Sequence, residues 1–241
     1  MKIRILLVSI WNKLLHPNRY NSEVFVNYLK NNGCKIGENT FFYAPLKTTI
    51  DDRRLDYITI GNKCSITQGC QILCHDFSWS VLRKSHNEIL PDPGQEVVIG
   101  DNVFLGWNTI VLGGVHIGSN VIIGANSVVT HDVPDNMVYA GNPARQICTL
   151  EEYYIKRKEN ELVNAFARAK HIHDKTGRDP YSEEMGWFGV LWLERDDKNE
   201  EYLRKLGMHG DSIDEVIKAF YAKKPIYEGF EAFLKDARDY Y

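Results

Sequence analysis

His75 and Asp76 are the residues of this sequence best placed for acid–base chemistry. They end the run Ile72-Leu-Cys-His-Asp, immediately before a long segment, residues 77–96, that breaks the pattern of the surrounding chain. An imidazole has an ordinary pKa near ~6.5, so it accepts a proton from a hydroxyl group at neutral pH. We therefore take His75 as a candidate general base, the alternative being a surface histidine that only hydrogen-bonds at a turn. Asp76 is a candidate to orient the ring or to bind an acceptor.

The segment 77–96 carries side chains suited to holding a substrate. Phe77 and Trp79 offer aromatic faces, and Arg83 and His86 offer hydrogen-bond donors. Function collects on long excursions from a regular scaffold, because a cleft can be built there. These four residues are candidate substrate contacts, although the aromatic pair would equally serve to pin the loop to a neighbouring subunit.

The secondary structure that positions these residues is indicated by an unusual repeat in the sequence. Six aliphatic residues follow one another at intervals of six, and four of them are followed by glycine, which tolerates unusual backbone angles at a turn. The residue four places further on is small or β-branched. This period fits neither a helix nor a simple strand and predicts short strands on successive faces of a prism, the signature of a hexapeptide parallel β-helix. The aliphatic positions are Ile99, Leu105, Val111, Ile117, Ile123 and Val129.

The repeat divides the chain into an all-β core with helices at both ends. Residues 1–33 are predicted to be a helical segment, with a helix from Ser22 to a stop at Gly33. Residues 34–149 are the predicted β-helix of about four coils, whose ladder should end near Pro134 and Pro143. Residues 150–241 are a predicted α-helical extension that begins with one long helix stopping at Gly177.

Composition narrows the function classes. The net charge of −3 gives no electrostatic case for binding nucleic acid or an anionic membrane. The N-terminal apolar run is interrupted by Lys2 and Arg4 and is too short to span a bilayer. The five cysteines are expected to be buried free thiols, which predicts a cytoplasmic protein, and no pair has zinc-finger spacing, so no metal is expected.

The hexads, the loop with its histidine, and the exit VVTHDVPDNMVYAGNPARQI resemble the hexapeptide-repeat acyltransferases, over about Ile60 to Arg145. Similar proteins include the galactoside, maltose and xenobiotic acetyltransferases and the sugar O-acetyltransferases of capsule and lipopolysaccharide clusters. The resemblance implies a left-handed β-helix and a homotrimer with active sites between subunits. It also implies that His75 deprotonates an acceptor hydroxyl for direct attack on acetyl-CoA, with a backbone N–H near Trp107 facing the oxyanion.

The same resemblance assigns the contacts to acetyl-CoA. Small residues would let the pantetheine arm approach the backbone, although turn geometry alone would also explain them. Arg145 would meet the nucleotide phosphates, a surface ion pair being the alternative, and His131 stands where relatives carry lysine. The assigned residues are Gly106, Trp107, Gly124, Ala125, Thr130, His131 and Arg145.

The predicted function is an acetyl-CoA-dependent O-acetyltransferase that modifies a saccharide hydroxyl in surface polysaccharide biosynthesis. Two alternatives stay open: an N-acyltransferase acting on an amino sugar or nucleotide-linked amino sugar, and a non-catalytic β-helix scaffold. A γ-type carbonic anhydrase shares the fold but needs three histidine ligands to zinc, and the closely spaced pair it uses is missing between His75 and His131. A nucleotidyltransferase fusion is disfavoured, because no glycine-rich nucleotide-binding motif precedes the coils.

Overall fold

The computed structural model describes residues 11–207, 210 and 212–240, and the chain forms two compact units, Met1–Tyr153 and Tyr154–Tyr241. The predicted N-terminal helix falls partly on residues 1–10, outside the described residues; residues 11–15 are helical. Helix α2 (Ser22–Asn31) begins at the N-cap Asn21, whose side chain accepts from the Val24 N–H, and the chain then turns at Gly33 with φ +105°.

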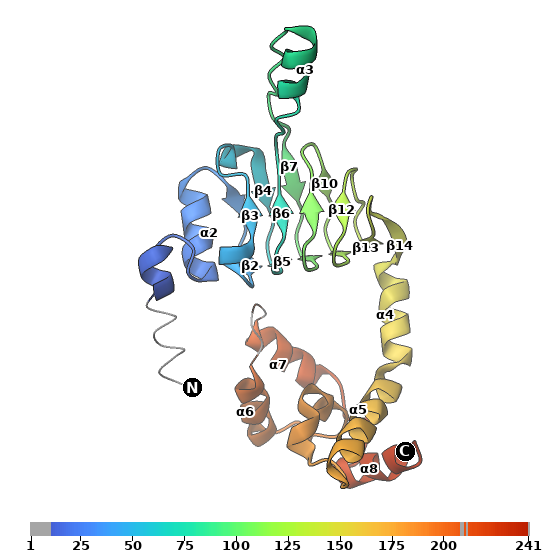
Figure 1. Ribbon diagram of the computed structural model, residues 1–241. Helices are drawn as coiled ribbons and strands as arrows, with labels where there is room; N and C mark the ends of the chain where they lie inside the picture. Colours follow the sequence, from blue (N-terminus) through green and yellow to red (C-terminus); the bar gives the residue numbers. More distant parts are fainter. Residues whose placement is uncertain (1–10, 208–209, 211, 241) are drawn as a thin grey trace. The chain divides into compact units, whose positions relative to one another are not determined.

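The first unit is a three-sided coil of short parallel strands (Figure 1). Each strand pairs with the strand one coil earlier and one coil later, which is the arrangement of a parallel β-helix. The first sheet consists of β1 (Lys35–Ile36), β4 (Ile58–Ile60), β7 (Val97–Ile99) and β10 (His116–Ile117). The second consists of β2 (Phe41–Phe42), β5 (Ser65–Ile66), β8 (Val103–Leu105), β11 (Val121–Ile123), β13 (Met137–Ala140) and β14 (Arg145–Thr149). The third consists of β3 (Thr49–Ile50), β6 (Gln71–Ile72), β9 (Ile110–Val111) and β12 (Val128–Val129).

The core of the coil follows the period of the sequence. All six predicted aliphatic positions are buried, and so are the small or β-branched positions four residues later, such as Thr109 and Ser127. Cys64 and Cys70 occupy equivalent inward positions and are fully buried. Each coil therefore stacks its apolar residues on those of its neighbours, and burial of this continuous column is what stabilises the unit.

The corners of the coil use asparagine and glycine for different reasons. The left-handed backbone conformation expected for glycine falls instead on asparagines, including Asn102, Asn108 and Asn120 with φ of 54° to 58°. The side chain of Asn102 donates to Asn120 at 2.8 Å, and that of Asn108 donates to Asn126 at 3.1 Å. Gly106 is needed for close approach, since a Cβ there would lie 2.6 Å from the Ala125 nitrogen. The expected turn role of glycine is thus corrected to one of backbone contact between coils.

Three insertions interrupt the coils. Two are single 3₁₀ turns, η1 (Pro45–Lys47) and η2 (Leu55–Tyr57). The third is the 77–96 loop, which contains helix α3 (Trp79–His86), an element that the sequence analysis did not anticipate. Figure 1 shows α3 standing out from the strands, and none of its residues is buried. The ladder keeps its register across this loop, since Ile72 on β6 pairs with Val111 on β9.

The end of the coil differs from the prediction that Pro134 would stop the ladder. Val133 still bridges to Ile117, and β13 pairs in parallel with β11 beyond the proline. Pro134 is tolerated because it lies between strands, where no ladder hydrogen bond is required of it. Pro143 stands in the turn of an antiparallel hairpin formed by β13 and β14.

The second unit is α-helical. The predicted long helix is two helices, α4 (Leu150–Glu159) and α5 (Glu161–Thr176), which separate at Asn160 with φ −89° and ψ 1°. The segment η3 (Ser182–Leu191) is 3₁₀ and kinks at Gly186, and α6 (Asp197–Leu206), α7 (Ile213–Ala222) and α8 (Phe230–Arg238) follow. Among the described residues, every helix is too short or too polar to cross a bilayer.

Candidate active site

The imidazole of His75 hydrogen-bonds to the carboxylate of Asp51. The contact joins His75 Nδ1 to Asp51 Oδ2. Asp51 directly follows strand β3 and His75 stands three residues after strand β6, and these two strands pair in the same sheet with Ile50 opposite Ile72. The side chain of Asp51 is 6% exposed and that of His75 is 29% exposed. A buried carboxylate thus holds a ring whose other edge reaches the surface.

Cys74 completes the surroundings of the Asp51 carboxylate. Its thiol lies 3.2 Å and its backbone N–H 3.4 Å from Asp51 Oδ2. Burial by itself raises the pKa of Asp51, but the hydrogen bonds from Cys74 and His75 and the charge of the imidazole outweigh it and hold this pKa below its ordinary value. Asp51 is therefore ionised at neutral pH, where it acts as an acceptor only.

An ionised Asp51 fixes the tautomer of His75. Because the carboxylate can only accept, Nδ1 carries the proton, and the lone pair of the neutral ring is on Nε2. Within the described residues Nε2 has no hydrogen-bond partner. The pair therefore has the arrangement that a general base requires, a fixed ring whose Nε2 is unengaged among the described residues.

The carboxylate of Asp76 contacts its own loop instead of the imidazole. Oδ1 of Asp76 accepts from both the backbone N–H and the hydroxyl of Ser78, each at 2.8 Å. The orienting role considered for Asp76 therefore belongs to Asp51, because successive residues of an extended chain point in opposite directions. Asp76 keeps its second predicted role, contact with the acceptor, as a proposal.

The base of the 77–96 loop closes beside His75. The Gln95 N–H donates to the Cys74 carbonyl at 2.7 Å, and the Asp76 N–H donates to the Asp92 carboxylate at 2.7 Å. Arg54 adds a hydrogen bond to the Pro93 carbonyl at 2.6 Å. The first two bonds join the two ends of the loop to each other, and the Arg54 bond joins the loop to the segment that follows Asp51, so the loop leaves the coil at a fixed point.

The candidate substrate residues lie along that loop. The rings of Phe77 and Trp79 meet edge to face with centroids 4.8 Å apart. Phe77 is 65% exposed, Arg83 is exposed, and His86 contacts the Ser85 hydroxyl at 2.7 Å. Most of this surface has no packing partner within the described part of the chain.

The candidate cofactor residues gather on two corners of the coil. Gly106 and Trp107 follow β8, and Gly124 and Ala125 follow β11 one coil later, so the four stack on one corner. Trp107 is 56% exposed. Its carbonyl accepts from the Asn126 N–H at 2.7 Å, while its own N–H has no acceptor among the described residues. An unused N–H is the feature that an oxyanion donor requires.

The remaining cofactor candidates follow strand β12 or begin strand β14. Thr130 and His131 follow β12 in the sheet that contains β6, and the Thr130 hydroxyl contacts His131 Nδ1 at 2.8 Å. Arg145 begins β14 beside Ala140 and is exposed, with one hydrogen bond to the Ala144 carbonyl. The structure thus stacks four of the seven cofactor candidates on one corner and places Arg145 beside Ala140, which a Cβ on Gly124 would meet at 2.8 Å. Thr130 and His131 follow a strand of a different sheet.

Asp51, Cys74 and His75 each offer an atom of a type that binds metals. One ligand atom from each lies within 4.8 Å of the others. Burial, followed by the nearby Asp51 carboxylate, raises the pKa of the Cys74 thiol to about 12, so this thiol stays protonated and donates to the carboxylate. Because a thiol binds a metal as the thiolate, the three residues fit a hydrogen-bonded network better than a metal site.

Asp51 is the functional residue that sequence reasoning missed. The sequence places it at the start of the polar interruption 51–57, where it reads as part of an exposed loop. The signal that would have found it is the register: Ile50 and Ile72 occupy the same inward position of successive coils, so the residues just beyond them meet at one corner. Twenty-four residues of sequence separate the pair.

Residues 96–131 match the family described as hexapeptide repeat of succinyl-transferase. The chain is 43% identical to Protein CapG of Staphylococcus aureus over 128 residues, which cover 53% of this chain and 73% of that protein. It is 35% identical to the galactoside O-acetyltransferase of Escherichia coli over 138 residues, 55% of this chain and 63% of that enzyme.

Among solved structures, a hexapeptide-repeat-containing acetyltransferase from Vibrio cholerae, complexed with acetyl coenzyme A, is 30% identical with a TM-score of 0.42, over 49% of this chain and 61% of that chain. The matches with the galactoside enzyme and this structure span less than two thirds of those proteins. The hexapeptide match and the likeness to CapG over most of its length show the family. The chain belongs to the hexapeptide-repeat acyltransferases.

Proposed function

We propose that this chain transfers an acetyl group from acetyl-CoA to a saccharide hydroxyl, in the biosynthesis of a surface polysaccharide, with His75 as the general base. The observation that carries the proposal is the buried Asp51 carboxylate on His75 Nδ1, which leaves Nε2 free to accept a proton. The names of the relatives support the chemistry, since one is a galactoside O-acetyltransferase and another was solved with acetyl coenzyme A.

The proposed reaction is a direct attack. His75 Nε2 takes the proton of the acceptor hydroxyl as its oxygen bonds to the thioester carbonyl carbon. The resulting tetrahedral oxyanion is stabilised by a backbone N–H, for which Trp107 is the candidate. The carbon–sulfur bond then breaks, and the imidazolium returns its proton to the departing thiolate of CoA. Asp51 keeps the ring oriented and stabilises the positive charge that the ring carries between these steps.

We propose a homotrimer, because one chain by itself does not close this arrangement. His75 and Gly113 share one corner, because a Cβ on Gly113 would lie 3.2 Å from the Cys74 carbonyl. Trp107 precedes Gly113 by six residues along one face, so the two corners of a single chain are roughly 15–20 Å apart at ~3.3 Å per residue. A neighbouring left-handed coil that presents its Trp107 corner to His75 would bring the base and the oxyanion donor together.

The other candidates take roles around that cleft. Gly106, Gly124 and Ala125 would let the pantetheine arm lie against the backbone, and Thr130, His131 and Arg145 would contact the rest of acetyl-CoA. Asp76, Phe77, Trp79, Arg83 and His86 would contact the saccharide from the loop. The five cysteines are all free, which is consistent with the cytoplasm, the compartment that also holds acetyl-CoA.

The test compares acetyl transfer by wild type and His75→Ala. The measurement is the release of the free CoA thiol in the presence of sugars, amino sugars or nucleotide sugars as acceptors. His75→Ala is expected to lower kcat by several orders of magnitude while the subunit assembly is retained. Wild-type turnover in His75→Ala would remove the proposed base, and turnover with amino sugars alone would make the enzyme an N-acyltransferase.

Donor binding is tested separately by melting temperature. Acetyl-CoA at about 100 times its Kd should stabilise the protein by about 2.7 kcal/mol through linkage. No change in Tm at millimolar acetyl-CoA would favour a non-catalytic scaffold.

A further inference from the structure

The helical unit contains two adjoining cavities that the proposed reaction does not use. The larger, about 390 Å³, lies among α4, α5 and η3. The smaller, about 240 Å³, extends to α6 and α7. They share five lining residues, Lys158, Glu161, Trp187, Val190 and Leu191, so they form one concavity around Trp187. Its size falls in the range of roughly 300–1,000 Å³ found for small-molecule sites.

The walls of this concavity are held by two different apolar clusters. Gly186 adopts φ 57° and ψ −128°, which kinks η3 directly before Trp187 and Phe188. Trp187 packs against the cluster of Leu203 and Phe220, and Phe188 packs against a separate cluster around Trp192. Both aromatic rings are half-buried, so each is anchored on one side and offers its other side to the cavity.

The lining is basic on a protein whose net charge is −3. Glu161 is the acidic residue that lines the two cavities, and it is paired with Lys158. Arg195 donates to backbone carbonyls. Three lining residues have a cationic side chain without a hydrogen bond or ion pair within residues 11–207, 210 and 212–240: Arg157, Lys223 and Lys224.

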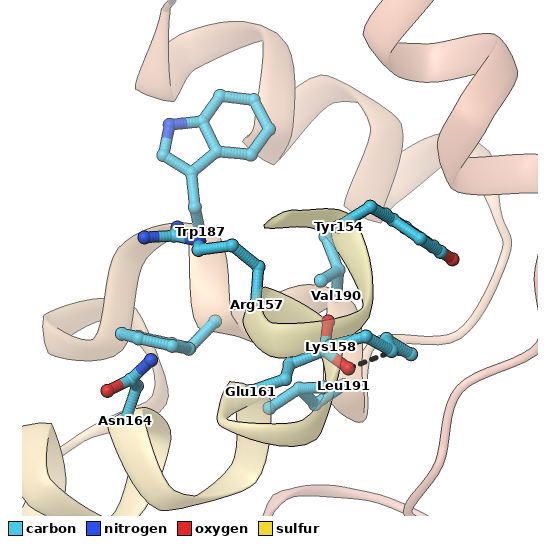
Figure 2. A pocket seen from close by; sticks show the side chains of 9 residues that line it. Tyr154, Arg157, Lys158, Glu161, Asn164, Trp187, Val190 and Leu191 are labelled. Carbon is cyan, nitrogen blue, oxygen red and sulfur yellow. Dashed lines mark hydrogen bonds and ion pairs between the residues drawn. The ribbon is translucent and has the colours of Figure 1, made fainter. Parts of the chain in front are cut away.

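Figure 2 shows how the polar groups are distributed. Lys158 extends to Glu161, whereas Arg157 is directed to the side of the cavity where Trp187 stands, and the amide of Asn164 lies at another edge. The Asn164 side chain has no hydrogen-bond partner in the described part of the chain. An unpaired guanidinium, an unpaired amide and an aromatic face therefore border the same space.

We propose that this concavity binds an acidic saccharide and so serves as an acceptor subsite; the inference rests on the proposed function for the class of acceptor. Trp187 offers a flat apolar surface for the C–H face of a sugar ring, and Asn164 offers a donor and an acceptor for hydroxyl groups. The fork of Arg157 matches a carboxylate or a phosphate with two parallel hydrogen bonds. Because the concavity belongs to a chain that we propose to acetylate a saccharide, a saccharide is the anionic ligand that the proposal names; the local cations of the lining, not the net charge of −3, supply the attraction.

Binding is measured by calorimetry on the full chain without acetyl-CoA. The probes are hyaluronan hexasaccharide, which carries carboxylates, phosphopentamannose, which carries a phosphate, and neutral maltohexaose. We expect one or both acidic probes to bind and the neutral probe to bind at least about tenfold more weakly, a loss of about 1.4 kcal/mol. The acidic probe that binds identifies the source of the anion.

Arg157→Met keeps the apolar stem of the side chain and removes its charge. It should weaken binding of the acidic probe at least about tenfold, as expected for loss of a bidentate charged contact. Lys156→Met is the matched control, since Lys156 lies on the same helix and does not line either cavity; it should leave the affinity unchanged.

Three results would overturn the subsite: no binding of either acidic probe, equal binding of the neutral probe, or tighter binding of single-stranded oligo(dT) competing for the same place. An equal effect of Lys156→Met would also remove the role of Arg157. Loss of the subsite is distinguishable from failure of the proposed function, because thioester cleavage with a monosaccharide acceptor depends on His75 and needs no contact with the helical unit.

Discussion

At the scale of single residues, the site depends on a division of labour between Asp51 and His75. His75 lies at the surface and offers Nε2, whereas Asp51 is buried and supplies a fixed charge. A free imidazole in solution rotates and exchanges its tautomers. The contact with Asp51 removes both freedoms, so the Nε2 lone pair is held in one orientation, as the proposed proton transfer requires.

Asp51→Asn should therefore lower kcat by about 10²–10⁴-fold, because an amide can donate to Nδ1 and stabilise the wrong tautomer. The measurement is kcat and KM for acetyl transfer. Asp76→Asn is the comparison, and it should change KM for the acceptor more than kcat. The assignment of roles fails if Asp76→Asn has the larger effect on kcat.

The lowered pKa of Asp51 also predicts a dependence of stability on pH. Its folded-state pKa lies below the ordinary value of ~3.9, so its contribution is complete above that pH and is lost as the pH falls through the folded value. Wild type should be more stable than Asp51→Asn at neutral pH, and the difference should shrink in acid below pH ~4. Denaturant unfolding at a series of pH values measures this; a difference that grows on acidification contradicts it.

At the scale of elements, the coil is held together at its corners as well as in its core. Glycines allow the backbones of successive coils to touch, and asparagines supply both the left-handed turn and a side-chain ladder along the corner. The regularity of these corners lets the coil admit a long loop between β6 and β7 without losing register. The loop is thus an addition to a scaffold that already places Asp51 and His75 side by side.

Gly106→Ala should destabilise the coil by about 1–3 kcal/mol or more, since its Cβ would meet the Ala125 nitrogen at 2.6 Å. Gly177→Ala is the control, because Gly177 has φ +70° but no heavy atom within 4 Å. That change should cost only the strain of a left-handed residue, about 1–2 kcal/mol. Equal shifts of the unfolding midpoint in both variants would show that close approach is unimportant at Gly106.

At the scale of the whole molecule, the proposed base and the proposed oxyanion donor lie on different corners of one chain. The chain has a mass of 27.8 kDa, so light scattering should give three times that mass for the proposed trimer. If assembly served only to stabilise the coil, each chain would contain a complete site of its own. The proposed cleft makes assembly a condition for catalysis.

Mixed assemblies test this directly. His75→Ala removes the base, and Ala125→Trp would block the opposite side of the cleft. Each variant alone should be inactive, and trimers refolded from an equal mixture should regain about one quarter of wild-type activity by random assortment. Failure to regain activity, with mixed trimers demonstrated by mass, would place the whole site within one chain.

The sequence by itself determined the β-helix and its inward positions, because the same residue type returns every sixth place. His75 was proposed as the base from its place before the long loop and from the family resemblance, and that role stays a prediction. The helices of the second unit were also visible in the sequence, apart from the break at Asn160 and the kink at Gly186. The break and the kink both depend on local backbone angles, which cannot be predicted from the spacing of apolar residues. Helix α3 was not predicted, because a break in the hexads shows where the coil is interrupted but not which secondary structure the inserted residues form.

Only the tertiary structure decided the partner of His75. Asp76 is adjacent in sequence but bonds to Ser78, while Asp51 reaches the ring from the preceding coil. Because the coils stack, residues that are one coil apart in the sequence come into direct contact. The register of the strand pairing determines which side chains lie at the same corner. The basic concavity around Trp187 likewise arises from three-dimensional packing, since its residues come from helices whose individual sequences show only charge and apolar spacing.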